Sequence, residues 1–264
     1  MPHARSGDAR IAYEVAGEGE PLLMIMGFAT DARMWMFQLP ALTQRFRCIT
    51  LDNRGVGGSP YVPGDLTLEQ MAADARAVLD AEGIGRAHVM GISMGGAIAQ
   101  HLALDSPDRV DRLILAATWC RANPYLPRMA SVGRTLLRDS GQAWVVRASM
   151  LWLFTPRFLL EFGEALDQIE RIAADMGMQP AVFDQQVEAI LRHDTAGRLA
   201  SLTVPTLVLT GERDIFVPTE LSVETAEAIP GAELVVLPGG HAFNVEHFAE
   251  FNEAVLRFLS REPG

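Results

Sequence analysis

The sequence of 264 residues contains no lysine, and all 22 of its basic residues are arginines. Without a lysine amine, the chain cannot form a Schiff base with pyridoxal phosphate or with a carbonyl substrate through such a side chain. It also lacks the lysine of a Walker-type phosphate loop and the lysine that contacts phosphates in protein kinases. Any fixed cationic contact to a substrate must therefore come from arginine.

Cysteine is nearly as scarce, and its spacing is not typical of a metal site. Only Cys48 and Cys120 occur, both in apolar segments and neither in a Cys-x-x-Cys pair or a Cys/His cluster. This pattern predicts no zinc site and favours two buried free thiols over a single disulfide. We expect no metal and no other cofactor.

Long apolar runs are also absent, since no stretch of 18 apolar residues occurs and the first seven residues are mostly polar. We therefore expect no membrane span and a cytoplasmic location, although removal of a signal peptide would leave the same sequence. The 33 acidic residues give a formal net charge of −11, which repels nucleic acid and anionic lipid. We expect neither a nucleic-acid partner nor a membrane partner, and a monomer or homodimer.

Short apolar runs alternate with amphipathic segments up to residue 121. The runs predict strands at residues 11–15, 22–26, 48–51, 87–90 and 113–116. Helical periodicity predicts helices at residues 67–82 and 94–105, and Thr67 and Gln70 at the start of the first have capping-box spacing. Strands separated by helices of this length predict an α/β fold with a mostly parallel central sheet flanked by helices.

The pattern changes between residues 122 and 197, where no strand-like run occurs. Four prolines divide this segment into about four predicted helices: Pro124, Pro127, Pro156 and Pro180. Large apolar side chains recur there at helical spacing: Trp144, Met150, Trp152, Phe154, Phe158, Phe162, Met176, Met178 and Phe183. We interpret residues 122–197 as a helical cap inserted into a core of residues 1–121 and 198–264. The core resumes with strands at 204–210 and 233–237 and helices at 219–229 and 247–260.

The strongest local motif is Gly91-Ile92-Ser93-Met94-Gly95, which follows a predicted strand and opens a predicted helix. In this context the Gly-x-Ser-x-Gly pattern predicts a nucleophile elbow, in which the serine lies on a strained strand-to-helix turn. The flanking glycines leave room for neighbouring elements to pass close to the turn. Ser93 is therefore the predicted nucleophile.

A serine hydroxyl needs a base and an orienting acid, which in this architecture follow in the order Ser, Asp or Glu, His. Of the six histidines, only His241 lies in a loop after a late strand, so it is the predicted base. The others fall in the N-terminal tail, in a strand or on helices: His3, His88, His101, His193 and His247. Asp214, which follows the strand at 204–210, is the predicted acid. Glu212 is its nearest rival and Asp194 a weaker one.

Two backbone amides are needed to bind the oxyanion that forms during acyl transfer. One is predicted to come from Met94, the residue after the nucleophile. The other is predicted to come from Phe28, in the Gly27-Phe28-Ala29 loop that follows an early strand.

These motifs resemble those of the α/β-hydrolase superfamily over nearly the whole chain. The resemblance rests on Met26-Gly27-Phe28, the Asp-Asn-Arg-Gly-Val-Gly-Gly-Ser segment at 52–59, the Ser93 elbow, the Gly-Glu-Arg-Asp turn ending at Asp214, and Gly240-His241-Ala242-Phe243. Residues 30–35 and 116–119 are further similar to small bacterial carboxylesterases and the 3-oxoadipate enol-lactonase-like group. The resemblance implies a cap after the strand that ends near residue 117 and a structural role for segment 52–59. Many members carry histidine where this chain has Met26. The methionine in place of the polar imidazole makes the pocket more apolar.

The predicted pocket is mainly apolar and contains one candidate cation. The predicted lining residues are Met26, Arg33, Trp119, Phe216 and Phe243, and Arg121 and Arg128 are further cationic candidates. The aromatic and methionine side chains favour an apolar acyl or aryl group over a dianion.

Hydrolysis of a small-molecule carboxylic ester or lactone through an acyl-enzyme is the leading hypothesis for function. Three alternatives stay open: an enol-lactonase of aromatic catabolism, a C–C bond hydrolase, and a small-molecule receptor with slow turnover on the same fold. The first would need an arginine to contact the carboxylate of its substrate. Serine rather than aspartate at the elbow argues against epoxide hydrolases and haloalkane dehalogenases of this fold.

Overall fold

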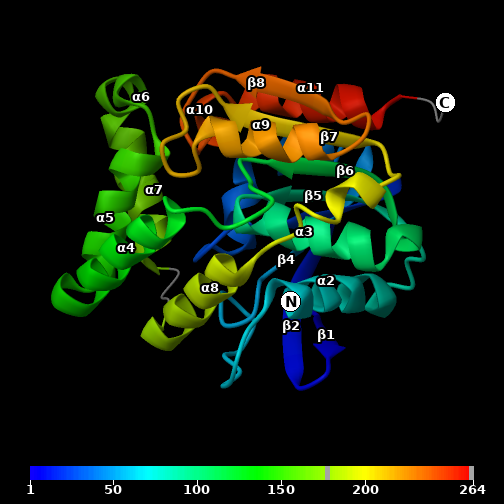
Figure 1. Ribbon diagram of the computed structural model, residues 1–264, viewed down its shortest axis with the longest axis horizontal. Helices are drawn as coiled ribbons and strands as arrows, with labels where there is room; N and C mark the ends of the chain where they lie inside the picture. Colours follow the sequence, from blue (N-terminus) through cyan, green and yellow to red (C-terminus); the bar gives the residue numbers. More distant parts are fainter. Residues whose placement is uncertain (176–178, 262–264) are drawn as a thin grey trace.

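The computed structural model describes residues 1–175 and 179–261, and its centre is an eight-stranded sheet (Figure 1). The strands lie in the order β1-β2-β4-β3-β5-β6-β7-β8, with β1–β2 and β2–β4 antiparallel and the other pairs parallel. Their bounds are β1 (His3–Ser6), β2 (Ala9–Ala16), β3 (Glu20–Ile25), β4 (Phe46–Leu51), β5 (Ala87–Ile92), β6 (Val110–Ala116), β7 (Thr206–Gly211) and β8 (Glu233–Leu237). The predicted α/β fold with a mostly parallel sheet is confirmed.

Helices cover both faces of this sheet, and each face has its own cluster of buried apolar side chains. On one face the cluster includes side chains of α2 (Leu68–Ala81), α3 (Met94–Asp105) and α9 (Thr219–Ala228). On the other face it includes side chains of η1 (Ala32–Phe37), α1 (Leu39–Leu42), α10 (Phe243–Glu246) and α11 (Phe248–Leu259). Short turns at η2 (Pro107–Arg109) and η3 (Leu199–Ser201) complete the core. Along α11 the apolar stripe buries Phe251, Val255 and Phe258. Burial of each such side chain contributes about 1.5–3 kcal/mol.

Local signals predict most of these elements well, with β8 and α3 at their predicted bounds. The capping box of α2 is formed, because Thr67 Oγ1 accepts from the Gln70 amide at 3.2 Å and Gln70 Oε1 accepts from the Thr67 amide at 3.0 Å. Strand β1 is a correction, since the sequence assigns its residues, including His3, to a tail. Only Ala4 of this four-residue strand is buried, so no readable alternation marks it.

Between β6 and β7 the described residues form five α-helices, where the sequence predicts about four. They are α4 (Leu126–Ser140), α5 (Gln142–Leu153), α6 (Pro156–Glu161), α7 (Gly163–Asp175) and α8 (Pro180–Arg192), and together they are called the helical insertion below. Pro156 and Pro180 begin helices as expected, whereas Gly141, at φ +83°, ends α4 and adds a further boundary. In Figure 1, α4–α7 stand together beside the sheet and α8 leads back toward the core. Met176 and Met178, predicted to lie on a helical face here, are outside the described residues.

The chain enters and leaves the helical insertion through two segments that lie side by side. The Ala122 amide donates to the His193 carbonyl at 3.0 Å. The buried His193 ring contacts the Trp119 carbonyl through Nε2 at 3.2 Å and His101 Nε2 through Nδ1 at 3.0 Å. Burial, and after it the neighbouring His101, lowers the pKa of His193 to about 4.

This buried histidine predicts a loss of stability in acid. Because unfolded histidine titrates near pH 6.5 and folded His193 near pH 4, the unfolded state binds more protons between these values. The contribution of His193 to the free energy of unfolding is fully present above pH 6.5. It decreases by about 3 kcal/mol as the pH falls from 6.5 to 4. Urea unfolding of the parent and of His193→Gln should show a difference in unfolding free energy that shrinks over this range. A difference that does not change with pH would contradict the expectation.

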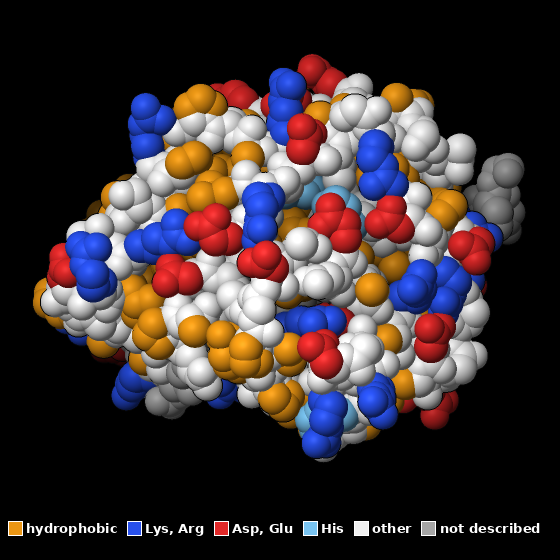
Figure 2. Space-filling model, turned by 60° about the horizontal axis from the view of Figure 1, so that its bottom comes forward, with side chains coloured by type: hydrophobic (Ala, Val, Ile, Leu, Met, Phe, Trp, Pro, Cys, Tyr) orange, Lys and Arg blue, Asp and Glu red, His pale blue; other side chains and the backbone are white. Residues whose placement is uncertain are grey.

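The surface carries both signs of charge, and Figure 2 shows arginine and acidic side chains interspersed over one face. Some form exposed ion pairs, such as Arg134 with Asp184 at 2.8 Å and with Glu188 at 2.6 Å. Exposed pairs of this kind contribute about 0–1 kcal/mol each. Within residues 1–175 and 179–261, no helix combines the length and the apolar character needed to cross a bilayer.

Candidate active site

Ser93 lies on a tight turn between β5 and α3, at φ +57° and ψ −122°, where residues with side chains are rarely found. Two glycines make this turn possible. A Cβ atom on Gly91 would lie 2.1 Å from the Gly95 carbonyl oxygen, and one on Gly95 would lie 2.1 Å from the Ile25 carbonyl oxygen. Backbone strain of this kind costs about 1–3 kcal/mol and clusters at functional sites.

Two backbone amides lie close to this turn. Within residues 1–175 and 179–261, neither the Phe28 amide nor the Met94 amide donates a hydrogen bond. The loop that carries Phe28 passes close to the serine, since a Cβ atom on Gly27 would lie 3.1 Å from Ser93 Cβ. Met94 opens α3, whose N-terminus carries a partial positive charge. The two amides predicted as oxyanion donors are therefore both in the vicinity of Ser93.

Asp214 and His241, predicted to act together, form a buried pair. His241 Nδ1 lies 2.8 Å from Asp214 Oδ2, which joins the loops after β7 and β8. The other carboxylate oxygen, Oδ1, accepts from the Phe216 amide at 2.9 Å and the Val217 amide at 2.8 Å. A carboxylate acceptor at Nδ1 fixes the proton there, which leaves Nε2 of the neutral ring able to accept a proton.

Within the described part of the chain, neither rival of Asp214 forms a hydrogen bond or ion pair with His241, and both have other partners. Glu212 is exposed and pairs with Arg213 at 3.3 Å. Asp194 is exposed and accepts from the Ala196 amide at 3.1 Å. Among the described residues that line the cavity beside Ser93, His241 is the only histidine.

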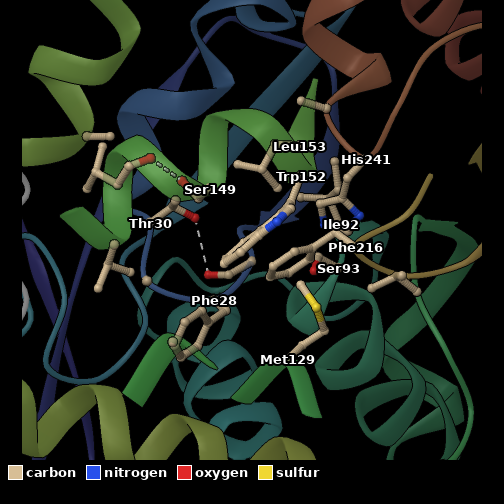
Figure 3. A pocket seen from close by; sticks show the side chains of 18 of the residues that line it. Phe28, Thr30, Ile92, Ser93, Met129, Ser149, Trp152, Leu153, Phe216 and His241 are labelled. Atoms are coloured by element: carbon tan, nitrogen blue, oxygen red, sulfur yellow. Dashed lines mark hydrogen bonds between the residues drawn. The ribbon is translucent and has the colours of Figure 1, made fainter. Parts of the chain in front are cut away.

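Ser93 and His241 line a cavity of about 240 Å³ between the carboxyl ends of the strands and the helical insertion (Figure 3). Figure 3 shows Trp152, Phe216 and Met129 grouped around Ser93. The polar lining side chains other than Ser93 and His241 are neutral: Thr30, Gln142, Ser149 and Asn244. No arginine, aspartate or glutamate is among the described lining residues. The cavity therefore suits an uncharged, apolar group.

Three of the five residues predicted to form the pocket contribute to the cavity wall. Met26, Trp119 and Phe216 line it, the last with its ring centroid 5.0 Å from that of His241. Their positions follow from the topology, because each comes directly or within a few residues after a strand of the parallel sheet.

The other two predicted pocket residues, Arg33 and Phe243, are corrections, since neither lines the cavity. The Arg33 side chain is 55% exposed and pairs with the buried carboxylate of Asp31 at 2.8 Å, at the start of η1. Phe243 begins α10, which turns its ring into the core against Phe251, with ring centroids 5.5 Å apart.

The remaining arginine candidates also lie outside the cavity lining. Arg121 pairs with Glu224 at 2.5 Å, and Arg128 donates to the Pro124 carbonyl. The sequence left open whether an arginine faces the site, and none of the described lining residues is one.

The segment at 52–59 supports the loop that carries Phe28. Asp52 accepts from the Ala32 amide at 2.9 Å and from the Gly58 amide at 2.8 Å. Asn53 Nδ2 donates to the Met26 carbonyl at 2.9 Å. These contacts are structural, as the family resemblance implies for this segment.

Two supporting residues were not identified from the sequence. The Glu246 carboxylate accepts from the Gly240 amide at 2.9 Å and from the Thr155 amide at 3.0 Å, so it joins the loop before His241 to the helical insertion. Gln186 of α8 is fully buried and accepts from the Ala29 amide at 3.1 Å. A glutamine on the apolar face of a helix is a signal that could have singled out Gln186, whereas nothing local distinguishes Glu246.

Comparison with known proteins adds to this geometry. A family model described as the alpha/beta hydrolase fold matches residues 20–248. A protein of Azorhizobium caulinodans named as a carbamate hydrolase, RutD, is 38% identical over 261 residues, which are 98% of each chain. The enol-lactonase of Burkholderia xenovorans superposes with a TM-score of 0.90 at 28% identity, covering 98% of this chain and 100% of its own. A thermophilic esterase of Thermogutta terrifontis superposes with a TM-score of 0.88 at 28% identity, and the match covers 97% of this chain and 97% of that chain.

Proposed function

This chain belongs to the α/β-hydrolase family and is a hydrolase of that type, and from this premise we propose that it cleaves carboxylic esters or lactones with Ser93 as nucleophile. One observation carries the proposal: Ser93, on its strained turn, lines the same cavity as His241, whose ring is hydrogen-bonded to the buried Asp214. Hydroxyl, imidazole and carboxylate are the three groups that nucleophilic acyl transfer requires.

In the proposed cycle, Ser93 Oγ attacks the carbonyl carbon while His241 Nε2 takes the hydroxyl proton. Asp214 stabilises the protonated ring. The Phe28 and Met94 amides donate to the oxyanion of the tetrahedral intermediate, where each such donor contributes about 100- to 1000-fold in kcat. His241 then gives its proton to the leaving oxygen, and the acyl group stays on Ser93. Water activated by His241 hydrolyses this ester, which releases the acid and restores Ser93.

The described lining of the cavity contains no arginine, aspartate or glutamate, which supports a substrate whose acyl or aryl group is neutral and apolar. A carboxylate buried there would have no cationic partner among the described lining residues, at a cost of several kcal/mol. An enol-lactone with a carboxylate is less well supported for the same reason. The flexible side chains of Met26, Met34, Met129 and Met150 in the lining favour a broad range of apolar groups.

Carbamate hydrolysis is the second candidate, and it is favoured by the 38% identity to the protein named as a carbamate hydrolase. The same attack by Ser93 applies to a carbamate carbonyl. The cavity then favours a carbamate with an apolar substituent over a small charged one.

Matched p-nitrophenyl esters test the preference for a neutral acyl group. We expect kcat/KM for the neutral hexanoate to exceed that for the hemiglutarate, which carries a carboxylate, by at least about 100-fold, because none of the described lining residues is a cation that could pair with that charge. Met129→Arg, at a half-buried position in the lining of the same cavity, should reduce the ratio of the two kcat/KM values. Equal turnover of the two esters by the parent would contradict the assignment of a neutral substrate.

The same assays distinguish the remaining candidates. Lactones, enol-lactones, an aryl carbamate and a vinylogous diketone complete the panel, and the largest kcat/KM identifies the reaction class. Steady release of p-nitrophenol well beyond one equivalent per chain would exclude a slow-turnover receptor.

A further inference from the structure

The loop after β3, which carries the proposed oxyanion amide of Phe28, contains a second strained residue. Ala29 adopts φ +65°, a conformation that alanine disfavours. Its amide donates to Gln186 Oε1 at 3.1 Å. The amides of Phe28 and Ala29 are successive, so this hydrogen bond fixes the peptide unit directly after the proposed oxyanion donor.

Gln186 reaches the loop from α8 of the helical insertion and uses both ends of its side-chain amide. While Oε1 accepts from Ala29, Nε2 donates to the Arg54 carbonyl at 3.5 Å, which specifies the orientation of the fully buried amide. Phe183, about one turn earlier, packs its ring edge-to-face with that of Phe28 at a centroid distance of 4.9 Å. Helix α8 therefore contacts two consecutive residues of the loop.

Helix α8 is attached to the core by other contacts that do not involve this loop. Gln185 donates to the Val62 carbonyl at 3.2 Å and to the Gly64 carbonyl. Arg192 donates to the Leu66 carbonyl at 3.1 Å. Gln186 thus acts from a helix whose position is fixed independently of the residue that it contacts.

We propose that Gln186 is a positioning residue for the oxyanion hole, which holds the Phe28 amide in place through its hydrogen bond to Ala29. The inference rests on the proposed function, because it takes the Phe28 amide to be a donor. It makes the helical insertion a part of the catalytic geometry as well as a wall of the cavity. Since the oxyanion forms only in the transition state, loss of the bond should lower kcat and leave KM nearly unchanged.

Gln186→Met is the direct test, because methionine has a similar size but is a poor hydrogen-bond acceptor. With p-nitrophenyl butyrate we expect kcat to fall about 10- to 100-fold and KM to change by less than about threefold. Affinity for a boronic acid that mimics the tetrahedral intermediate should fall by the same factor as kcat/KM. The matched control Gln185→Met should lower the melting temperature and keep kcat within about twofold of the parent.

Parent-like kcat and inhibitor affinity in Gln186→Met would overturn the proposal. An equal loss of kcat in Gln185→Met would also overturn it, because the effect would then come from the docking of α8. If Gln186→Met does not fold, Gln186→Asn withdraws the amide by one methylene and should show the same loss of kcat, with parent-like kcat again overturning the proposal. Ester hydrolysis that survives Ser93→Ala would refute the proposed function instead, and this inference with it.

Discussion

Replacement of Ser93 by alanine is expected to lower kcat for p-nitrophenyl butyrate by about 10⁴- to 10⁶-fold, the range for loss of a catalytic serine. The proposed acyl-enzyme cannot form without the hydroxyl. Only residual catalysis from the Phe28 and Met94 amides and from binding would remain. The rate is measured by release of p-nitrophenol, and thermal unfolding checks that the variant is folded.

The matched control for this variant is Ser149→Ala. Ser149 lines the same cavity from α5, but its hydroxyl donates to the Val146 carbonyl at 2.6 Å, and His241 is the only histidine among the described lining residues. Its replacement should keep kcat within about threefold of the parent. Substantial hydrolysis by a folded Ser93→Ala variant would refute the assignment of the nucleophile.

The second large effect is expected for Asp214→Asn, which should lower kcat by about 10³- to 10⁴-fold. The Phe216 and Val217 amides donate to Oδ1, so the asparagine oxygen is expected to take that place. The new NH₂ group then faces His241 Nδ1, which must become an acceptor. The ring proton moves to Nε2, and the base can no longer take the proton of Ser93.

Glu212→Gln is the control for this substitution, because Glu212 is an exposed carboxylate on the same turn. It should leave kcat within about twofold of the parent. The comparison uses kcat at saturating ester together with thermal unfolding of both variants. If Asp214→Asn kept more than about a tenth of the parent kcat, the role of Asp214 as the orienting acid would be wrong.

The sheet and the proximity of Asp214 to His241 could be predicted because both follow from local patterns and one topological rule. Strong apolar runs mark β7 and β8, and the carboxyl ends of neighbouring parallel strands meet at one edge of a sheet. The residues that come directly after these strands must therefore lie near each other. The Ser93 turn could be predicted from its own Gly-x-Ser-x-Gly pattern. Gly91 is required by a local approach, that of the Gly95 carbonyl oxygen, whereas Gly95 is required by the approach of Ile25 from β3.

The residues that the sequence misplaced depend on rotation of a side chain about its own element. Phe243 is close in sequence to His241, but the single turn of α10 points its ring into the core. Arg33 lies near the oxyanion loop, but Asp31 offers its guanidinium a buried carboxylate two residues away. Spacing along the sequence indicates which residues lie near a site, but it does not determine which side chains point into it.

The supporting contacts were beyond prediction for another reason, because they depend on how the helical insertion docks. Gln186 meets Ala29 across 157 positions of sequence, and Glu246 meets Thr155 across 91. No periodicity in one segment specifies the register of contacts with another that is so distant. The partners of Gln186 and Glu246 became known only with the packing of α8 and α10.

Labelling with a fluorophosphonate is the sharpest test of Ser93 as the nucleophile, because this reagent reacts covalently with an activated serine. We expect one phosphonyl group per chain, located by peptide mass spectrometry on Ser93, with loss of esterase activity in proportion to labelling and no labelling of Ser93→Ala. Full activity at saturating reagent, or a loss of activity that follows labelling of a different residue, would contradict this assignment.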